Sequence, residues 1–411
     1  MSIVRISHPT KKIKARISIP GSKSESNRLL ILNELSGNKL NLENLSTARD
    51  TQQLKRILLS DDVTVDVTDA GTCMRFLTAY YCASNQHKII TGSNRMKKRP
   101  IRPLVNALSE IGFDVRYLGE EGFPPLEIVP VKLEKLDNEA FIEGNVSSQF
   151  ISALLLIAPF LPNGLKVNFT TELASKPYVE MTLKMLENIG VTHTWTENVI
   201  EIKNTPVQRG SFSVGGDWSA ASYWYSIAAI ADEAEIFLEG LRDDWIQGDR
   251  AIVDWMKRFG VITEFSGEGA LLRKEKVDVP RIMKLNFSDN PDLAQTFAGM
   301  FAAKNIYATF SGIESLKIKE TDRIAALRNE LKRVNVNFDY SDRYKFYQLK
   351  GEMQLPTVPI KTYNDHRMAM SFAPLGLLGE IQIENPEVVD KSYPGFWGDL
   401  VKAGFKISSI R

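Results

Sequence analysis

The segment GSKSESNR, which begins at Gly21, brings together three groups that suit an anionic ligand. Lys23 supplies an ammonium, Ser24 a hydroxyl and Arg28 a guanidinium, and we expect all three at the start of a helix. Helix N-termini bind anions readily, because their first N–H groups have no partner within the helix. The segment lacks the wider glycine pattern of a nucleotide-binding P-loop, so we do not expect ATP binding. The alternative is a turn that binds no phosphate.

The segment KIKETDR, which ends at Arg323, has the composition of an acid–base site. A helix that begins near Thr321 would gather Lys319, Glu320 and Arg323 within one turn. A carboxylate between two cations suits a group that exchanges a proton beside a phosphate. The alternative is that Glu320 only pairs with Arg323 and organises the start of the helix.

Two further basic segments carry weaker signals. RMKKRP begins at Arg95, and a charge run of this kind is usually a solvated face, as we expect for Lys97 and Lys98. NDHR places Arg367 at the start of an apolar helix, beside His366, which we expect to be structural. No two histidines have the spacing of metal ligands, so we expect no metal.

These segments lie within a pattern that repeats six times. In each copy, a helical stretch with apolar residues three or four apart leads through a small or polar turn into a short strand. The copies span residues 54–67, 104–117, 183–195, 252–265, 327–340 and 400–407. Glycines stand where a helix C-terminus favours them, at Gly112, Gly190, Gly260 and Gly404. Six such units in 411 residues predict two domains of three units each.

Each unit also contains a second helix that is almost wholly apolar. These helices are expected to begin near Ser24, Ala70, Ser147, Ser219, Pro291 and Asp365. Small or polar residues at their starts predict buried helices with capped N-termini at a surface. If three run parallel in each domain, six positive dipole ends can face one cleft, which favours an anionic substrate. Ordinary N-caps on core helices are the alternative for any one of them.

The composition excludes several classes of protein. With 51 basic and 50 acidic residues, the chain is not a generally basic nucleic-acid-binding protein. Cys73 and Cys82 are too few for a disulfide scaffold or a structural zinc site. The longest apolar run, residues 150–161, is too short to cross a bilayer, and the N-terminus does not resemble a signal peptide. We expect a cytoplasmic protein that binds neither nucleic acid nor membrane.

The motifs also follow one another in a recognisable order. From Pro20 to Pro394 they are PGSKSESNR, AGTCMR, NRMKKRP, VSSQF, SKPY, NPD, KETDR, NDHR and DKSYP. In this order the chain resembles the 5-enolpyruvylshikimate-3-phosphate synthase family of enolpyruvyl transferases. The resemblance implies an α/β fold, a two-domain inside-out αβ barrel in which each domain has three pseudo-symmetric inverse αβ repeats with parallel buried helices. It implies one domain over residues 18–216, a second over 217–411 plus 1–17, and an active site in the cleft between them.

The activity that the resemblance implies is transfer of the enolpyruvyl group of phosphoenolpyruvate to the 5-hydroxyl of shikimate 3-phosphate. Phosphate is released by addition and elimination, in the pathway to chorismate and the aromatic amino acids. The two small-molecule substrates are the expected partners; no cofactor is implied, and we expect a monomer. Clustered cations without substrate would repel one another, which favours an open state that closes when the anions bind.

The resemblance also assigns roles to individual residues. Those implied for phosphoenolpyruvate are Lys23, Gly71, Arg95, Gln149, Arg323, Arg367 and Lys391. Those implied for shikimate 3-phosphate are Lys23, Ser24, Arg28, Ser147, Ser148, Gln149, Ser175, Tyr178, Asp292, Ser315 and Lys319. The implied catalytic residues are Lys23, Asp292, which should face the 5-hydroxyl, and Glu320, which should face the enol carbon.

Three positions depart from the family pattern, and two rival functions remain open. Asp69, Phe76 and Ser315 stand where the family commonly has Asn, Pro and Asn, and none of them removes an implied catalytic group. The first rival is the UDP-N-acetylglucosamine enolpyruvyl transferase, which usually carries a reactive cysteine where residues 87–95 have none. The second is a non-catalytic anion-binding protein of the same fold, in which losses among the catalytic residues would be expected.

Overall fold

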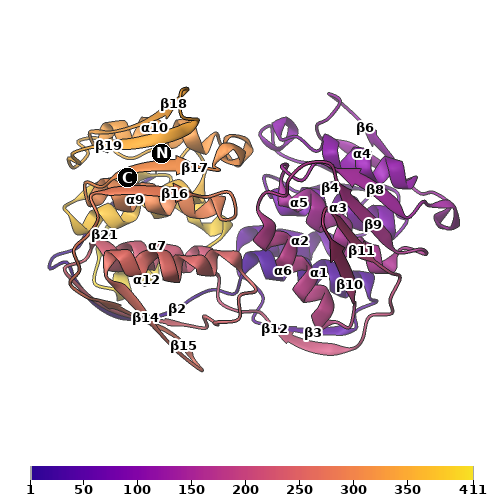
Figure 1. The fold of residues 1–411 in the computed structure, drawn as a ribbon, viewed down its shortest axis with the longest axis horizontal. Helices are drawn as coiled ribbons and strands as arrows, with labels where there is room; N and C mark the ends of the chain where they lie inside the picture. Colours follow the sequence, from indigo (N-terminus) through magenta and orange to yellow (C-terminus); the bar gives the residue numbers. More distant parts are fainter. Residues whose placement is uncertain (1, 411) are drawn as a thin grey trace. The chain divides into compact units, whose positions relative to one another are not determined.

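The structure, a computed structural model, describes residues 2–410 and divides into two compact units. The C-terminal unit contains the described residues up to Ser22, Thr47–Arg49 and the residues from Gly215 onward. The N-terminal unit contains Lys23–Ser46 and Asp50–Val214. Figure 1 follows the chain through both units by colour.

Two four-stranded sheets of the C-terminal unit share one topology, in which the first two strands are parallel and the other neighbours antiparallel. One sheet has the order β2 (Lys12–Ser18), β13 (Glu233–Glu239), β15 (Gly269–Lys274) and β14 (Val261–Ser266). The other has the order β16 (Ile282–Asn286), β17 (Tyr307–Ser311), β19 (Phe346–Gly351) and β18 (Val336–Ser341).

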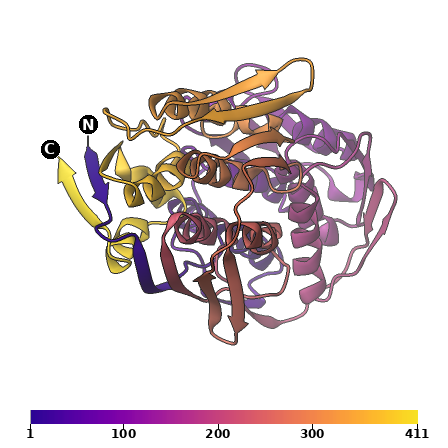
Figure 2. The same ribbon diagram turned by 60° about the vertical axis from the view of Figure 1, so that its left-hand side comes forward.

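The third sheet of this unit joins the two ends of the chain. β1 (Ile3–Ser7) lies between β20 (Ile381–Glu384) and β21 (Lys406–Ile410) and is antiparallel to both. A single parallel bridge between Ile360 and Ile383 stands where the other sheets have a first strand. Figure 2 shows the chain ends side by side.

The N-terminal unit repeats the same arrangement. One of its sheets has the order β4 (Thr64–Asp66), β5 (Lys88–Thr91), β7 (Leu126–Val129) and β6 (Asp114–Tyr117). Another has the order β8 (Glu139–Ile142), β9 (Leu165–Phe169), β11 (Val199–Ile202) and β10 (His193–Thr196). The third is the parallel pair β3 (Leu40–Glu43) and β12 (Gly210–Ser213).

Each repeat supplies one inner and one outer helix. The inner helices are α1 (Lys23–Leu35), α3 (Gly71–Ala83) and α5 (Ser148–Ile157) in the N-terminal unit, and α7 (Trp218–Ile230), α9 (Ala294–Ala303) and α11 (His366–Phe372) in the C-terminal unit. The outer helices are α2 (Arg49–Leu58), α4 (Arg102–Ile111), α6 (Lys176–Asn188), α8 (Ile252–Met256), α10 (Arg323–Arg333) and α12 (Phe396–Lys402). The six predicted repeats are confirmed, since every predicted copy is an outer helix followed by a strand.

The sequence explains where these helices end and what they cover. Gly112 and Gly260 adopt left-handed φ angles of 108° and 78° at helix C-termini, a conformation that costs glycine little. The inner helices α7 and α9 can be buried because they are apolar on nearly all sides; Trp224 on α7 and Phe297 on α9 are fully buried. No helix within residues 2–410 combines the length and the apolar character needed to cross a membrane.

One predicted boundary is wrong. α10 begins at Arg323 rather than near Thr321. The side chain of Asp322 accepts a hydrogen bond from the backbone N–H of Ala325 over 3.0 Å, and this N-cap makes Arg323 the first helical residue, two residues after Thr321. Lys319 and Glu320 therefore lie in the connection before the helix, after the 3₁₀ turn Glu314–Ile318.

Candidate active site

Arg323 is the centre of a charged cluster in the C-terminal unit. Its side chain is 2% exposed, and its guanidinium donates to Asp365 over 2.7 Å and to Glu320 over 2.8 Å. A third carboxylate, that of Asp292, lies 3.0 Å away. Burial lowers the pKa of Arg323, but the carboxylates outweigh burial and raise it above its ordinary value. One fixed cation therefore holds three carboxylates in place.

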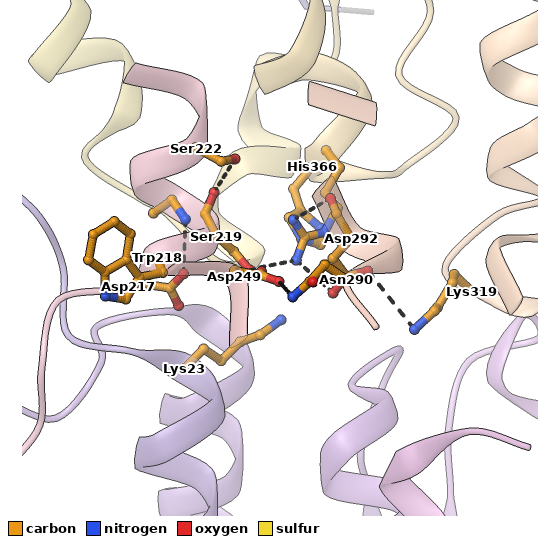
Figure 3. Close-up of polar contacts among 12 residues, drawn as sticks. Lys23, Asp217, Trp218, Ser219, Ser222, Asp249, Asn290, Asp292, Lys319 and His366 are labelled. Carbon is orange, nitrogen blue, oxygen red and sulfur yellow. Dashed lines mark hydrogen bonds and ion pairs between the residues drawn. The ribbon is translucent and has the colours of Figure 1, made fainter. Parts of the chain in front are cut away.

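Arg367 joins the starts of the three inner helices of this unit. Its Nη2 donates to Asp292 over 2.9 Å and to the hydroxyl of Ser219 over 3.3 Å. Ser219 and Arg367 are the second residues of α7 and α11, and Asp292 lies in the turn Pro291–Leu293 directly before α9. The N-termini of α7, α9 and α11 therefore converge; Figure 3 shows Ser219, Asp249 and Asp292 gathered there. Converging helix N-termini favour an anionic ligand.

Two lysines complete this cluster. The Nζ of Lys391, whose side chain is 1% exposed, lies 3.9 Å from Glu320, and the Nζ of Lys319 lies 4.0 Å from Asp292. Burial raises the pKa of Asp292, but Arg367, Lys319 and Arg323 outweigh burial and hold its pKa well below its ordinary value. Asp292 is therefore ionised at neutral pH.

The cations of this unit do not stand unopposed. Asp292, Glu320 and Asp365 lie between them and offset the repulsion that their clustering would otherwise cause. Electrostatic repulsion within the C-terminal unit is thus weaker than the cations alone imply. An anionic ligand bound to these cations would compete with the carboxylates for the same donors.

A second group of polar side chains surrounds the start of α1 in the N-terminal unit. Lys23 is the first residue of this helix, and its Nζ lies 3.2 Å from the carboxylate of Asp50. The buried guanidinium of Arg28 donates to Thr182 over 2.8 Å and to Ser152 over 2.9 Å. Burial lowers the pKa of Arg28 to about 10, which still leaves it charged at neutral pH.

The same guanidinium reaches the other predicted residues of this group. It donates to the backbone carbonyl oxygens of Ser24 over 2.9 Å and of Tyr178 over 3.3 Å. It also lies 5.3 Å from the centre of the Phe76 ring, at a position that departs from the family pattern. Arg28 therefore connects the inner helices α1, α3 and α5 with the outer helix α6.

The serines assigned to the 3-phosphate lie at two helix starts. The hydroxyl of Ser147 caps α5 by accepting from the backbone N–H of Gln149 over 3.4 Å, and Ser148 is the first residue of that helix. Ser175 precedes α6 with a left-handed φ of 54°. Their positions at N-termini agree with an anion site.

Gly71, the first residue of α3, lies against the guanidinium of Arg99. A Cβ added to Gly71 would lie 2.5 to 2.9 Å from the guanidinium atoms of Arg99, which is 4% exposed. Arg95 is half-buried and precedes the 3₁₀ turn Met96–Lys98. Lys97 and Lys98 are exposed, as the charge run predicts.

The comparisons with known proteins decide the family. The sequence profile of the family described as EPSP synthase (3-phosphoshikimate 1-carboxyvinyltransferase) matches residues 53–400. The chain belongs to this family. The resemblance predicted from the motifs is confirmed.

Curated relatives agree with this assignment, and a solved structure shows the same fold. The chain is 46% identical to a 3-phosphoshikimate 1-carboxyvinyltransferase of Bacteroides fragilis strain YCH46, over 96% of this chain and 97% of the relative. It is 32% identical to one of Vibrio campbellii, over 95% and 97%. An EPSP synthase structure from Acinetobacter baumannii covers 100% of both chains with a TM-score of 0.74 at 20% identity. That likeness shows the fold, an inside-out αβ barrel of two domains, as predicted.

The structure of this EPSP synthase family member groups the predicted site residues within each unit. The C-terminal unit brings together Asp292, Lys319, Glu320, Arg323, Arg367 and Lys391. Ser315 is half-buried in the preceding turn Glu314–Ile318. The N-terminal unit joins Arg28 to Ser24 and Tyr178, and Ser147 caps its α5, which begins with Ser148 and Gln149. Within residues 2–410, no three or more His, Cys, Asp or Glu side chains are grouped to hold a metal ion.

Three residues beside these groups have no predicted role in the sequence. Asp50 faces Lys23, Arg99 faces Gly71, and the buried Asp249 accepts from the hydroxyl of Ser219. Arg99 is buried although it directly follows the exposed Lys97 and Lys98, and the charge run in the sequence gives no sign of this difference. The other two are distant in sequence from their partners, and no local pattern marks them.

Proposed function

We propose that this chain transfers the enolpyruvyl group of phosphoenolpyruvate to the 5-hydroxyl of shikimate 3-phosphate and releases phosphate. One observation in the C-terminal unit supports this reaction most strongly. Arg323 holds two carboxylates, Asp292 and Glu320, on one buried guanidinium. The reaction needs one group that takes a proton from an oxygen and another that exchanges a proton with a carbon. Two carboxylates fixed among cations can divide these tasks.

In the addition step, the 5-hydroxyl oxygen bonds to the phosphate-bearing carbon of phosphoenolpyruvate. The hydroxyl proton passes to Asp292, and Glu320 gives a proton to the methylene carbon, which becomes a methyl group. In the elimination step, the methyl group returns a proton to Glu320, and the C–O bond to phosphate breaks with its electron pair on the leaving phosphate. Asp292 then gives its proton to phosphate or solvent, so that both carboxylates regain their first state.

The charges around Asp292 suit it to act only when substrate is bound. Arg367, Lys319 and Arg323 keep its pKa low in the structure, which makes it a weak base. The phosphates and carboxylates of the substrates would neutralise the same cations and so raise the basicity of Asp292. Asp292 therefore becomes an effective general base once the anionic substrates are bound.

The proposed contacts of phosphoenolpyruvate come from both units. Arg323, Arg367 and Lys391 supply cations from the C-terminal unit, and Lys23 and Gln149 supply donors from the N-terminal unit. Gly71 would let the backbone approach the ligand closely. We assign Arg99 to this set in preference to Arg95, because the guanidinium atoms of Arg99 are the nearest to Gly71 and its side chain is buried, whereas Arg95 is half-buried.

The proposed contacts of shikimate 3-phosphate also come from both units. Ser147, Ser148, Ser175 and Lys319 would bind the 3-phosphate, with Gln149, Ser315 and Tyr178 beside them. Ser24 and Arg28 would bind the carboxylate. Small hydroxyls at helix starts suit a compact phosphate, and an ammonium adds a charge-assisted hydrogen bond.

Hydrogen exchange into the product tests the two-step chemistry. During the reaction in D₂O, Glu320 would give a deuteron to the methylene carbon, and elimination would remove one of three methyl hydrogens. Deuterium should therefore appear in the vinyl group of the product, as measured by proton NMR. In a control that lacks shikimate 3-phosphate, deuterium should not enter the methylene group of phosphoenolpyruvate. A product free of deuterium after many turnovers would rule out a freely rotating methyl intermediate.

A further inference from the structure

Asp249 connects two elements that carry the charged cluster of the C-terminal unit. It is 4% exposed and lies in the 3₁₀ turn Gly248–Ala251, between β13 and α8. One carboxylate oxygen accepts a hydrogen bond from the hydroxyl of Ser219, at the start of α7. The other accepts from the amide of Asn290 over 3.4 Å. Figure 3 shows Asp249 between Ser219 and Asn290.

The hydroxyl group of Ser219 links Asp249 to Arg367 through two hydrogen bonds. A serine hydroxyl has one hydrogen to donate, and an ionised carboxylate can only accept. Because Asp249 takes that hydrogen, the Ser219 oxygen presents its lone pairs to its other neighbour. Nη2 of Arg367 donates to this oxygen over 3.3 Å. Asp249 therefore decides whether Ser219 acts as an acceptor for Arg367.

Asn290 links Asp249 to Asp292, because its amide contacts Asp249 and it lies two residues before Asp292 in the chain. Asn290 immediately precedes the turn Pro291–Leu293, in which Asp292 accepts from Arg367 over 2.9 Å. The two hydrogen bonds of Asp249 thus lead to both side chains that accept from Nη2 of Arg367. This guanidinium also lies 3.4 Å from the hydroxyl of Tyr223, which is fully buried.

A carboxylate in this position is unfavourable for folding by itself. Burial and then the charge of Asp292 raise the pKa of Asp249 to about 6. A neutral side chain of similar size would avoid this cost of burial. The hydrogen bonds from Ser219 and Asn290 indicate a role for the carboxylate other than stabilising the fold.

We propose that Asp249 is a positioning residue, which holds Ser219 and Asn290 so that Arg367 and Asp292 keep one fixed arrangement. The inference rests on the proposed function in one respect, that phosphoenolpyruvate is the ligand of Arg367. A guanidinium that is held in place before the ligand arrives loses less entropy on binding. Asp249 acts through its neighbours and need not touch the substrate.

Binding of phosphoenolpyruvate to Asp249→Ala tests this inference. In the presence of shikimate 3-phosphate, calorimetry should show affinity reduced by about 10- to 100-fold, the scale of small misplacements in a site. The matched control is Asp254→Ala, on α8, because Asp254 is 50% exposed and pairs with Arg250 and Lys257 instead. The control should bind phosphoenolpyruvate as the wild type does. Unchanged affinity in Asp249→Ala would overturn the inference.

A second background separates positioning from a general loss of structure. In Arg367→Met, the change Asp249→Ala should weaken phosphoenolpyruvate binding by less than about 3-fold, because the group that Asp249 positions is gone. An equal further loss in both backgrounds would overturn the inference. Asp249→Asn provides a variant of the same size if alanine disturbs folding. Its oxygen can accept from Ser219, while its amide must face the amide of Asn290, so its affinity should lie between wild type and Asp249→Ala.

The behaviour of the wild type distinguishes a failure of this inference from a failure of the proposed function. If the wild type turns over both substrates and Asp249→Asn and Asp249→Ala bind phosphoenolpyruvate normally, the positioning role fails and the function stands. If the wild type neither binds phosphoenolpyruvate nor forms product, the function fails first.

Discussion

Arg323 and Asp365 form an ion pair with side chains that are 2% and 0% exposed, in which Nε donates to Oδ2 over 2.7 Å. The other oxygen of Asp365 caps α11 by accepting from the backbone N–H of Arg367 over 2.9 Å. One carboxylate thus fixes both the buried arginine of α10 and the helix start that carries the next arginine.

Asp365→Ala should lower the free energy of unfolding by about 3 to 5 kcal/mol, because it removes an N-cap and a partner of a buried charge. Urea denaturation measures this difference. The control is Asp339→Ala, since Asp339 is 63% exposed and lies 3.9 Å from Arg328, where the loss should be below about 1 kcal/mol. Equal losses in the two variants would show that the buried pair contributes no more than a surface pair.

Gly71→Ala should displace the guanidinium of Arg99, because the new methyl group would lie within 2.9 Å of it. Calorimetry should show phosphoenolpyruvate binding weakened by roughly 2 to 5 kcal/mol if that arginine contacts the ligand. Gly398→Ala is the control, since a Cβ there meets open space within α12 and should stabilise the helix by about 0.5 to 1 kcal/mol. Normal affinity in Gly71→Ala would return the assignment to Arg95.

Glu320→Gln keeps the shape of the side chain and removes its titratable proton. Turnover should fall by about 10²- to 10⁴-fold, the usual scale of a general acid–base group, while shikimate 3-phosphate still binds. Glu314→Gln, six residues earlier and exposed, should turn over normally. If Glu320→Gln retains near-normal turnover, Glu320 has only the structural role of pairing with Arg323.

The stability of the C-terminal unit should depend on pH through His8. Burial lowers the pKa of His8 below its ordinary value of 6.5, against the opposing effect of its contact with the carbonyl of Ala403. Nδ1 of His8 accepts a hydrogen bond from the backbone N–H of Lys11 over 3.0 Å. Protonation of Nδ1 would break this hydrogen bond within the connection between β1 and β2. The neutral form is thus favoured in the folded state. Its contribution is present above pH 6.5 and is lost as the pH falls from that value through the lower pKa of the folded state.

His8→Gln does not titrate and removes this dependence. Between pH 7.5 and 5, the unfolding free energy of the wild type should fall more steeply than that of the variant, as measured by urea denaturation at several pH values. Parallel curves would show that the imidazole has the same pKa in the folded and unfolded states.

The fold could be predicted from the sequence because its signals are local. Apolar spacing marks each outer helix, and left-handed glycines such as Gly112 and Gly260 mark the ends of four of them. The start of α10 was harder to predict, since Asp322 and Thr321 are both suitable caps and only the hydrogen bond to Ala325 distinguishes them. The local sequence pattern thus predicts the helix but does not determine its first residue.

The site could be predicted only where a motif carries it. KETDR and NDHR contain Glu320, Arg323 and Arg367, and the structure brings these residues together as the motifs suggested. Asp249 is thirty residues beyond its partner Ser219, and their contact depends on how β13 and the following turn fold back. Such a pairing has no periodicity in the sequence.

Phosphate release from phosphoenolpyruvate tests the proposed function most directly. The assay compares shikimate 3-phosphate with UDP-N-acetylglucosamine as acceptor, each with and without a chelator of divalent metals. We predict release with shikimate 3-phosphate alone, undiminished by the chelator, together with loss of that release in Glu320→Gln. Release with the UDP-sugar, or none with shikimate 3-phosphate, would contradict the account.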